Sequence, residues 1–417
     1  MRYSLASLLR RGLARNVGWT PAWRDAAPRA AYDVIVVGGG GHGLATAYYL
    51  ARNHDVGKVA VLERGWIGSG NTGRNTTIVR SNYLLDANAR FYEHGMKLWE
   101  GLSRELNFNV MFSQRGVINL AHSKPQMDGF ARRGNAMRLN GIDAELLDRE
   151  AVREKVPELD FSEAARFPIH GGLLQPRGGT ARHDAVVWGY ARAADRLGVD
   201  IIQDCEVTGF QMQGERVVGV HTSRGDIAAG RVGLAVAGHT GQVAALAGLR
   251  LPIESHLLQA CVSEPLKPLV DTVVTFGAGH FYLSQSDRGG LVFGGDLDGY
   301  NSYAQRGNLG MIEHVVAAGV SMMPCLSRTR LLRHWAGVMD MSMDGSPIIG
   351  ASPLDGLYLN CGWCYGGFKA TPASGWVFAH TLAEGAPHAL NQAFTLDRFA
   401  EGRCLDEKGA GPVPGAH

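Results

Sequence analysis

Two cations in glycine-rich surroundings are the side chains best suited to chemistry in this 417-residue chain. Arg80 ends the run Arg74-Asn75-Thr76-Thr77-Ile78-Val79-Arg80, and Lys369 lies in Gly366-Gly367-Phe368-Lys369. A guanidinium can form two parallel hydrogen bonds with a planar carboxylate, and an ammonium adds a compact second charge. The pair would suit a ligand with a carboxylate if the fold brings the two together. From position alone, a solvated surface side chain is the more ordinary expectation for each.

A glycine turn between a strand and a helix is the element most able to position a large ligand. Asp33–Val37 is a short β-branched run typical of a buried parallel strand, and Gly38-x-Gly40-x-x-Gly43 follows it at once, before an alanine-rich helical stretch. These glycines would allow the turn, the approach of a pyrophosphate and close helix packing. A second strand, Val59–Leu62, ends in Glu63, which could bind ribose hydroxyls. The pattern predicts a dinucleotide site.

A second glycine-rich loop, Gly65 to Thr77, helps to decide which dinucleotide the chain is expected to bind. It is suited to running along an extended cofactor beyond the first phosphates. An NAD-dependent dehydrogenase would normally continue into another regular βα unit. We therefore expect FAD rather than NAD.

The remaining elements predict an α/β fold with two interleaved domains. A helix is expected at 182–197, strands at 199–203, 206–210, 217–220 and 231–236, a small-residue turn at 237–241, and strand-like runs at 347–350 and 357–360. We assign 31–82, 168–250 and 336–400 to a discontinuous, Rossmann-like FAD-binding domain. A mixed-sheet substrate domain takes 83–167 and 251–335, with an arm at 1–30 and a tail at 401–417.

Composition excludes several classes of protein. Hydrophobic residues make up 45% and charged residues 19% of the chain, which is unlike a disordered or polytopic membrane protein. A net charge of +2 gives no support to nucleic-acid binding. The apolar stretch Val34 to Leu50 is broken by glycines, so we expect no membrane span. Six mostly isolated cysteines favour a reducing compartment, and no metal site is expected.

The first thirty residues leave localisation open. They contain six arginines and one acidic residue, Asp25, a pattern that a mitochondrial transit peptide can also show. A cytoplasmic bacterial location is the preferred expectation, with the mitochondrion as the alternative.

Together, these pieces resemble the flavoprotein family of D-amino-acid oxidase and of glycine and sarcosine oxidases. The resemblance runs nearly end to end and is most specific to the β subunits of heterotetrameric sarcosine oxidases. It rests on five runs of sequence: Gly38 to Ala47, Arg74 to Arg80, Phe112 to Gly116, Arg182 to Asp184 and Gly366 to Pro372.

The resemblance implies a division of labour among subunits. A β subunit binds FAD non-covalently and oxidises sarcosine to an imine, and a covalent FMN at the boundary with a large α subunit passes the electrons to oxygen to give hydrogen peroxide. NAD and the tetrahydrofolate that captures the one-carbon unit would belong to the α subunit, and smaller γ and δ subunits complete the complex. The arm, with Trp19 and Trp23, also looks like the arm of this family.

The resemblance also assigns residues. Arg80 and Lys369 look like the family's carboxylate-binding pair and are our catalytic candidates. The residues expected to bind FAD are Gly38, Gly40, Gly41, His42, Gly43, Glu63, Arg64, Asn71, Thr72, Arg74, Asn75, Thr76, Val207, Gly366, Gly367 and Lys369. Single-chain relatives hold FAD through a cysteine where this chain has Ala336 to Asp340, which contains none, so we expect non-covalent FAD.

The histidine that would carry FMN has two candidates. His183, between Arg182 and Asp184, is preferred, because a neutral imidazole is a good nucleophile toward the activated methyl group of a flavin. His170 is the rival, and an ordinary helix-start role for His183 is the remaining alternative.

Three further features stay open. Related subunits have glycine and threonine where this chain has Cys364-Tyr365, and this departure creates the CxxC of Cys361 and Cys364. No second CxxC or suitably spaced histidine pair accompanies it, so a redox or metal role is the minor interpretation. Core positions are the preferred interpretation of His280 and Tyr282, and lining of the substrate cavity is the alternative. A D-amino-acid or opine dehydrogenase subunit, or a non-catalytic flavin electron-transfer subunit, is the alternative function.

Overall fold

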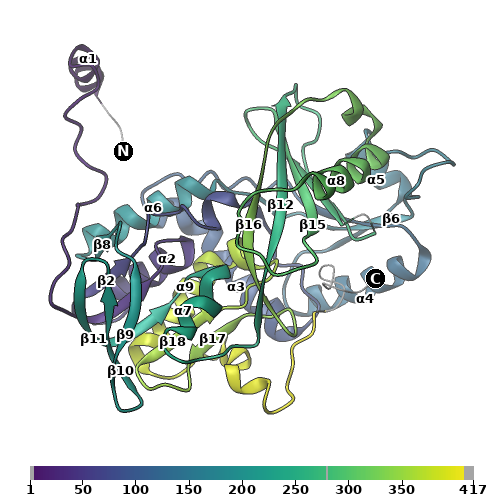
Figure 1. Cartoon of the computed structure of the whole chain (residues 1–417). Coiled ribbons are helices and arrows are strands. Elements are labelled where there is room, and N and C mark those ends of the chain that lie inside the picture. Colours follow the sequence, from purple (N-terminus) through teal and green to yellow (C-terminus); the bar gives the residue numbers. More distant parts are fainter. Residues whose placement is uncertain (1–3, 279, 408–417) are drawn as a thin grey trace.

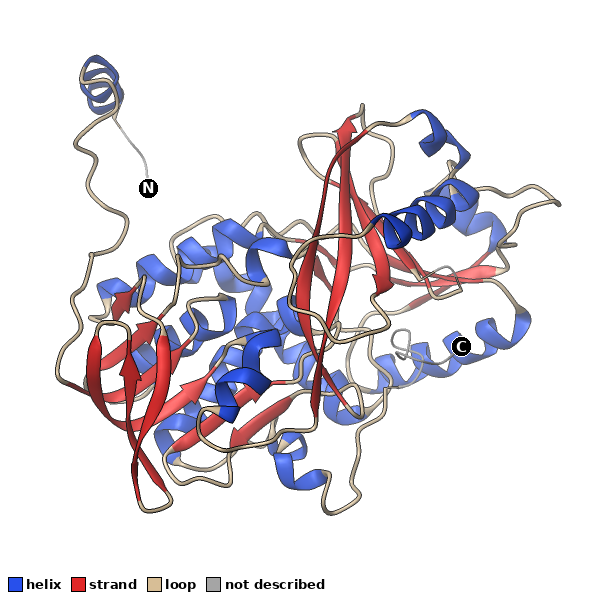
Figure 2. Ribbon diagram, viewed as in Figure 1, coloured by secondary structure: helices blue, strands red, loops and turns tan. Residues whose placement is uncertain are grey.

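The computed structural model describes residues 4–278 and 280–407 (Figure 1). It contains two eight-stranded sheets and a two-stranded ribbon of β3 (Ile78–Val79) and β7 (Gly179–Thr180). Figure 2 shows the two sheets as separate bodies of strands with helices around them. The predicted tail lies partly outside the described residues, as do the first three residues of the arm.

The first sheet has the order β17-β18-β11-β1-β2-β8, with β10 and β9 continuing from β11. β18, β11, β1, β2 and β8 run parallel, and their buried apolar runs are typical of strands covered on both faces. The strands are β1 (Ala31–Val37), β2 (Val59–Leu62), β8 (Asp200–Ile202), β9 (Val207–Gln213), β10 (Arg216–Thr222), β11 (Gly225–Leu234), β17 (Ile348–Ala351) and β18 (Leu357–Cys361).

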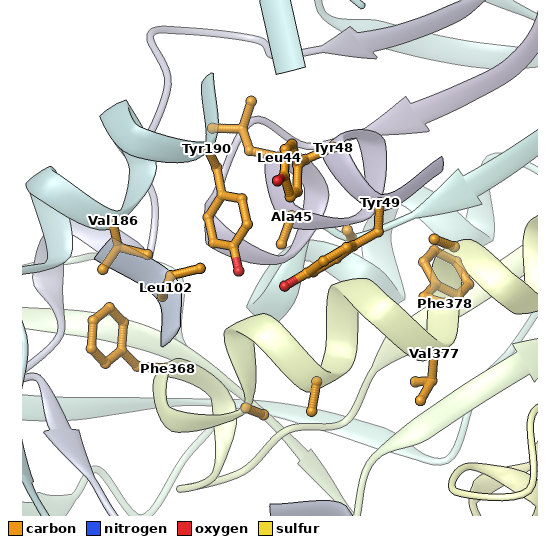
Figure 3. Close-up of a cluster of buried hydrophobic side chains, with 14 of the residues drawn as sticks. Leu44, Ala45, Tyr48, Tyr49, Leu102, Val186, Tyr190, Phe368, Val377 and Phe378 are labelled. Carbon is orange, nitrogen blue, oxygen red and sulfur yellow. The ribbon is translucent and has the colours of Figure 1, made fainter. Parts of the chain in front are cut away.

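Four helices pack together in the core of this first unit: α2 (Gly41–Asn53), α3 (Asp86–Glu105), α6 (His183–Arg196) and α9 (Gly367–Glu384). Figure 3 shows Tyr48, Tyr49 and Tyr190 meeting there beside Phe378. At Gly375, an added Cβ would overlap Ala45, so α9 can approach α2 this closely only because Gly375 has no side chain. α7 (Thr240–Ala245) follows the turn after β11.

The second sheet is mostly antiparallel, with the order β16-β12-β15-β14-β13-β4-β6-β5. Its separate core lies against α8 (Leu309–Met322) and α5 (Arg149–Lys155). α4 (Lys124–Leu139) contacts β4, β5 and β6, while its Met137 packs in the first core. The strands are β4 (Val117–Ala121), β5 (Glu145–Asp148), β6 (Gly171–Gln175), β12 (Ile253–Pro265), β13 (Val273–Phe276), β14 (Phe281–Gln285), β15 (Gly290–Leu297) and β16 (Leu331–Ser342).

The predicted α/β fold with two interleaved units is observed, but the sheet pairing differs from the predicted division at three places. β6 and the end of β16 were assigned to the FAD-binding segments, yet both pair within the second sheet. α3 was assigned to the substrate segments, yet it packs in the first core through Phe91 and Trp99. These pairings join residues far apart in the chain, which local sequence patterns do not report.

The arm leads away from the body and ends in a short helix, α1 (Leu5–Leu13) (Figure 1). In the described part of the chain no helix is long and apolar enough to cross a membrane. Within the same residues no cluster of three or more histidine, cysteine or acidic side chains could hold a metal ion.

Candidate cofactor and substrate site

The glycine turn after β1 has the geometry that its sequence predicts. Gly38 has a φ of +109°, a backbone conformation that residues other than glycine rarely adopt. A Cβ on Gly43 would overlap the carbonyl oxygen of Gly38, so the turn itself requires glycine there. At Gly40, an added Cβ would meet only the Thr72 hydroxyl, at 3.2 Å. The lack of a side chain at Gly40 therefore leaves open space at the N-terminus of α2.

Glu63 lies at the carboxyl end of β2 and is bound to the turn. Its carboxylate accepts hydrogen bonds from the backbone N–H groups of Gly39, at 2.8 Å, and Gly65, at 2.9 Å. Thr72 accepts from the N–H of Gly41 at 3.0 Å. The strand ends, the turn and the second glycine loop are thus held in one arrangement.

The second glycine loop joins the two units. Asn71 makes a paired hydrogen bond with the backbone of Val338 on β16, and the Trp335 indole donates to the carbonyl oxygen of Arg74 at 2.7 Å. The Arg74 guanidinium donates back to the carbonyls of Ser69 and Gly70. The loop therefore has a fixed shape along one wall of the space between the sheets.

His42 joins the N-termini of two helices. Its Nε2 lies 2.7 Å from the carbonyl oxygen of Gly367, so Nε2 carries the proton, and Nδ1 accepts from the Ser374 hydroxyl at 2.8 Å. Burial lowers the pKa of His42 to about 4, so the ring is neutral at pH 7. The first residues of α2 and α9 line one cavity, where the positive ends of helices favour an anionic ligand.

The cavity has a volume of about 1220 Å³ and lies between the two sheets. Ligand pockets commonly span about 300–1,000 Å³, so this one has room for a large cofactor together with a small substrate. The predicted cofactor residues that line it are Gly38, Gly40, Gly41, His42, Glu63, Arg64, Asn71, Thr72, Arg74, Asn75, Thr76, Val207, Gly367 and Lys369. Gly43, Gly366 and His183 are not among its lining residues.

Arg80 and Lys369 lie at the same cavity. Lys369 is buried and donates from Nζ to the carbonyl oxygen of Tyr365 at 2.5 Å. Burial, and then the charge of Arg80, hold the pKa of Lys369 well below its usual range. A bound carboxylate would oppose both effects, so this end of the cavity favours an anion.

Arg80 is held by a chain of side-chain amides. Its guanidinium donates to Asn82 at 2.5 Å and lies 5.1 Å from the ring centroid of Tyr83. Asn82 donates to Asn119 at 2.6 Å, and Asn119 donates to Thr275 at 2.6 Å. Asn82 is fully buried, and Asn119 and Thr275 belong to the second sheet. The position of Arg80 is therefore fixed from both units.

Sequence reasoning missed a third cation. Arg133, on α4, is buried and lines the same cavity. Burial, and then the nearby Arg80, lower its pKa to about 10. The available signal was an arginine on the same helical face as the buried Met137, an unusual place for a charge without a function.

His280 and Tyr282 also line the cavity, so the preferred interpretation of both as plain core residues was wrong. β14 begins at Phe281, and alternation along it directs Tyr282 away from the core that holds Phe281 and Leu283. Burial raises the pKa of Tyr282 to about 12, which keeps its hydroxyl protonated.

The two candidate flavin-attachment histidines have different surroundings. His183 is half-buried at the first residue of α6, and burial lowers its pKa, which favours the neutral imidazole. Arg182 and Asp184 on either side form an ion pair at 3.0 Å. His170 is exposed, just before β6. Neither histidine lines the cavity.

Cys361 and Cys364 are buried free thiols. Burial raises the pKa of Cys361 far above its usual range and that of Cys364 to about 11. Cys364 has a φ of +47°, and its Sγ accepts a hydrogen bond from the backbone N–H of Ser342 at 3.3 Å. Raised thiol pKa values disfavour reactive thiolates.

A parallel sheet with a glycine turn, an extended cavity and a cationic end defines a dinucleotide-dependent oxidoreductase. The profile of the family described as "FAD dependent oxidoreductase" matches residues 33–381, and the chain belongs to this family. The L-proline dehydrogenase structure from P. horikoshii superposes with a TM-score of 0.84 at 28% identity, covering 91% of this chain and 100% of its own.

More specific relatives are the β subunits of sarcosine oxidase. The subunit from Rhizobium meliloti is 67% identical over 417 residues and covers 100% of both chains. The subunit from Rhodobacter capsulatus is 50% identical over 412 residues and covers 99% of both. Within the FAD-dependent oxidoreductases, the chain therefore falls among sarcosine oxidase β subunits, which are parts of a multi-subunit enzyme.

Proposed function

We propose that this chain binds FAD non-covalently and oxidises sarcosine, N-methylglycine, at its C–N bond to an imine. The single observation that carries the proposal is the convergence of Arg80, Lys369 and the glycine turn on one cavity. Sarcosine offers one carboxylate and one secondary amine, so a cationic end beside a cofactor site suits its shape and charge.

The residues fit FAD in three respects. Gly40 leaves open the space that a pyrophosphate needs, two helix N-termini line the cavity, and the Glu63 carboxylate stands at the end of β2. Met339 lines the cavity within Ala336 to Asp340, which has no cysteine, so this chain offers no thiol there for a covalent bond. When bound, FAD supplies the acceptor for the two electrons that leave the substrate.

The chain's own residues position the substrate. Arg80 and Lys369 bind its carboxylate, and Asn82 keeps the guanidinium of Arg80 in place. Burial of the site removes water, which strengthens these charge-assisted hydrogen bonds. Positioning of this kind is a large part of amine oxidation, because the neutral amine must be aligned with the electron acceptor.

The fate of the electrons extends beyond this cavity. We propose that His183 carries a covalent FMN, which passes electrons to oxygen to give hydrogen peroxide, with His170 as the rival position. The lowered pKa of His183 and its place on a helix start outside the FAD cavity support a second flavin near a subunit boundary. Partner α, γ and δ subunits, with NAD and tetrahydrofolate in the α subunit, and a cytoplasmic location complete the proposal.

The test of the FMN position is acid-stable flavin fluorescence of the denatured chain. His183→Ala should abolish it while His170→Ala retains it, and the opposite pattern would assign the flavin to His170. Copurification of the complex with two flavins per catalytic unit, one FAD and one FMN, is the accompanying expectation.

The substrate is tested by anaerobic stopped-flow reduction of FAD in the complex. Sarcosine, L-proline and D-alanine are compared, because the structural likeness to an L-proline dehydrogenase makes a cyclic secondary amine the closest competing substrate. Faster reduction by sarcosine supports the proposal. Faster reduction by proline, or no reduction by any of the three, would contradict it.

A further inference from the structure

The helix α1 exposes an apolar stripe that nothing in the catalytic site explains. Its four leucines are exposed to 74% at Leu5, 48% at Leu8, 59% at Leu9 and 87% at Leu13, and no residue of the helix is buried. Their spacing of three and four residues places them along one side of the helix. Leucines gathered on one face normally pack against another surface, so this face is suited to being covered.

Local contacts hold the helix in shape while leaving that stripe open. The Ser4 hydroxyl caps the N-terminus by accepting from the N–H of Ser7 at 3.1 Å. At the other end, the Arg11 guanidinium donates to the carbonyls of Val17 and Gly18 and lies 5.3 Å from the ring centroid of Trp19. A nine-residue helix is marginal in water without such support. Within residues 4–278 and 280–407, nothing buries the apolar face of this helix.

The root of the arm is fixed to the body. Arg24 donates to Asp195 at 2.7 Å and to the carbonyl oxygen of Val199 at 2.9 Å, and Arg29 donates to Asp200 at 2.6 Å. Asp200 is buried at the start of β8, the outer strand of the first sheet. Because this end is anchored, the arm carries α1 away from the body of the protein (Figure 1).

The arm lies in a part of the chain that its relatives share to different extents. The family profile begins at residue 33, and the proline dehydrogenase structure covers 91% of this chain but all of its own. The two sarcosine oxidase β subunits instead cover 100% and 99% of this chain. The arm therefore lies outside the matched family profile and falls largely within the span covered by these two β subunits.

The charge of the arm indicates the chemistry of its partner. Residues 4–24 contain Arg10, Arg11, Arg15 and Arg24 and no acidic residue. We infer that α1 is a docking helix whose leucine stripe seats in an apolar, acid-rimmed groove on another subunit of the same oxidase complex. The inference rests on the multi-subunit assignment and does not depend on which amine is oxidised.

Hydrogen–deuterium exchange in the assembled complex tests the docking. Amides of residues 5–13 should exchange at least tenfold more slowly in the complex than in the isolated chain. Equal exchange in the two states overturns the inference. Protection that arises from self-association of the isolated chain, or only on phosphatidylglycerol vesicles, also overturns it, because the occupant is then a second copy or a membrane surface.

A double variant tests the stripe itself. Leu5→Ser with Leu9→Ser should lower retention of the companion subunits in size-exclusion chromatography at least tenfold, with FAD content and sarcosine-dependent FAD reduction unchanged. The matched control is Leu139→Ser, an 89% exposed leucine at the end of α4, which should assemble normally. Normal assembly of the double variant contradicts the inference. A wild-type complex with protected α1 that sarcosine fails to reduce contradicts only the proposed substrate.

Discussion

Replacing Lys369 by methionine would remove one charge of the proposed carboxylate-binding pair while keeping the length of the side chain. Lys369 is buried, and its Nζ donates to the carbonyl oxygen of Tyr365. A hydrogen bond to a charged group contributes about 1.5–3 kcal/mol. Because the substitution also relieves repulsion with Arg80, we expect the lower part of that range, ~1.5–2 kcal/mol, or about ten- to thirtyfold weaker binding.

The pH dependence of binding gives a second readout for the same residue. The protonated ammonium binds a carboxylate, and burial followed by the charge of Arg80 lowers its pKa in the free protein. A bound carboxylate raises that pKa again, so binding takes up a proton between the two values. Affinity should therefore fall as pH rises through the lowered pKa, by up to about tenfold per pH unit. In Lys369→Met this dependence should disappear.

Titration of the flavin absorbance with methoxyacetate measures this affinity, because methoxyacetate has the carboxylate but no oxidisable amine. Lys97→Met, at an exposed lysine of α3, is the matched control and should behave as the wild type. Wild-type affinity in Lys369→Met, or an unchanged pH dependence, would refute the role of Lys369 in carboxylate binding.

Three further predictions concern other parts of the chain. Gly40→Ala should fold normally yet bind FAD weakly, whereas Gly43→Ala should lose stability because its Cβ overlaps a backbone oxygen; equal FAD content in folded Gly40→Ala would contradict this. Asn82→Ala should raise KM for sarcosine about tenfold or more with FAD content unchanged, since the guanidinium loses its hydrogen bond; an unchanged KM would exclude a positioning role. Arg398→Met should cost about 3–5 kcal/mol in denaturant unfolding by leaving Asp344 buried without its 2.8 Å partner, and a loss below 1 kcal/mol would show that water replaces it.

Much of the fold followed from local sequence patterns. The predicted strand Val59–Leu62 matches β2, and the helix predicted over 182–197 is α6, bounded by Gly198. Such elements are readable because β-branched runs, helical periodicity and glycine act within a few residues. The α/β fold of the family is confirmed by the match to the FAD-dependent oxidoreductases and by the L-proline dehydrogenase structure.

The site was only partly predictable. Residues of the glycine motifs line the cavity because each motif fixes its own backbone, but Arg133 and Tyr282 reach it from α4 and β14 through tertiary packing. A sequence window around Arg133 shows a basic helix and gives no sign of a cavity. Cofactor and substrate roles for Arg80, Lys369 and His183 stay predictions that the proposed measurements address.

The position of β18 in the first sheet bears on how the protein is made. β11 pairs with β1 on one side and with β18 on the other, although β18 is synthesised last of the three. β10 already pairs with the first half of β11, but while the ribosome is still translating the second sheet, the edge of β11 at Val232–Leu234 is unpaired, which is a risk for aggregation and a natural target for chaperones. Helix α9, which contains Lys369, emerges from the ribosome later still, so a prematurely terminated chain has no complete site. Retention of the yellow cofactor thus distinguishes finished molecules from translation fragments during purification.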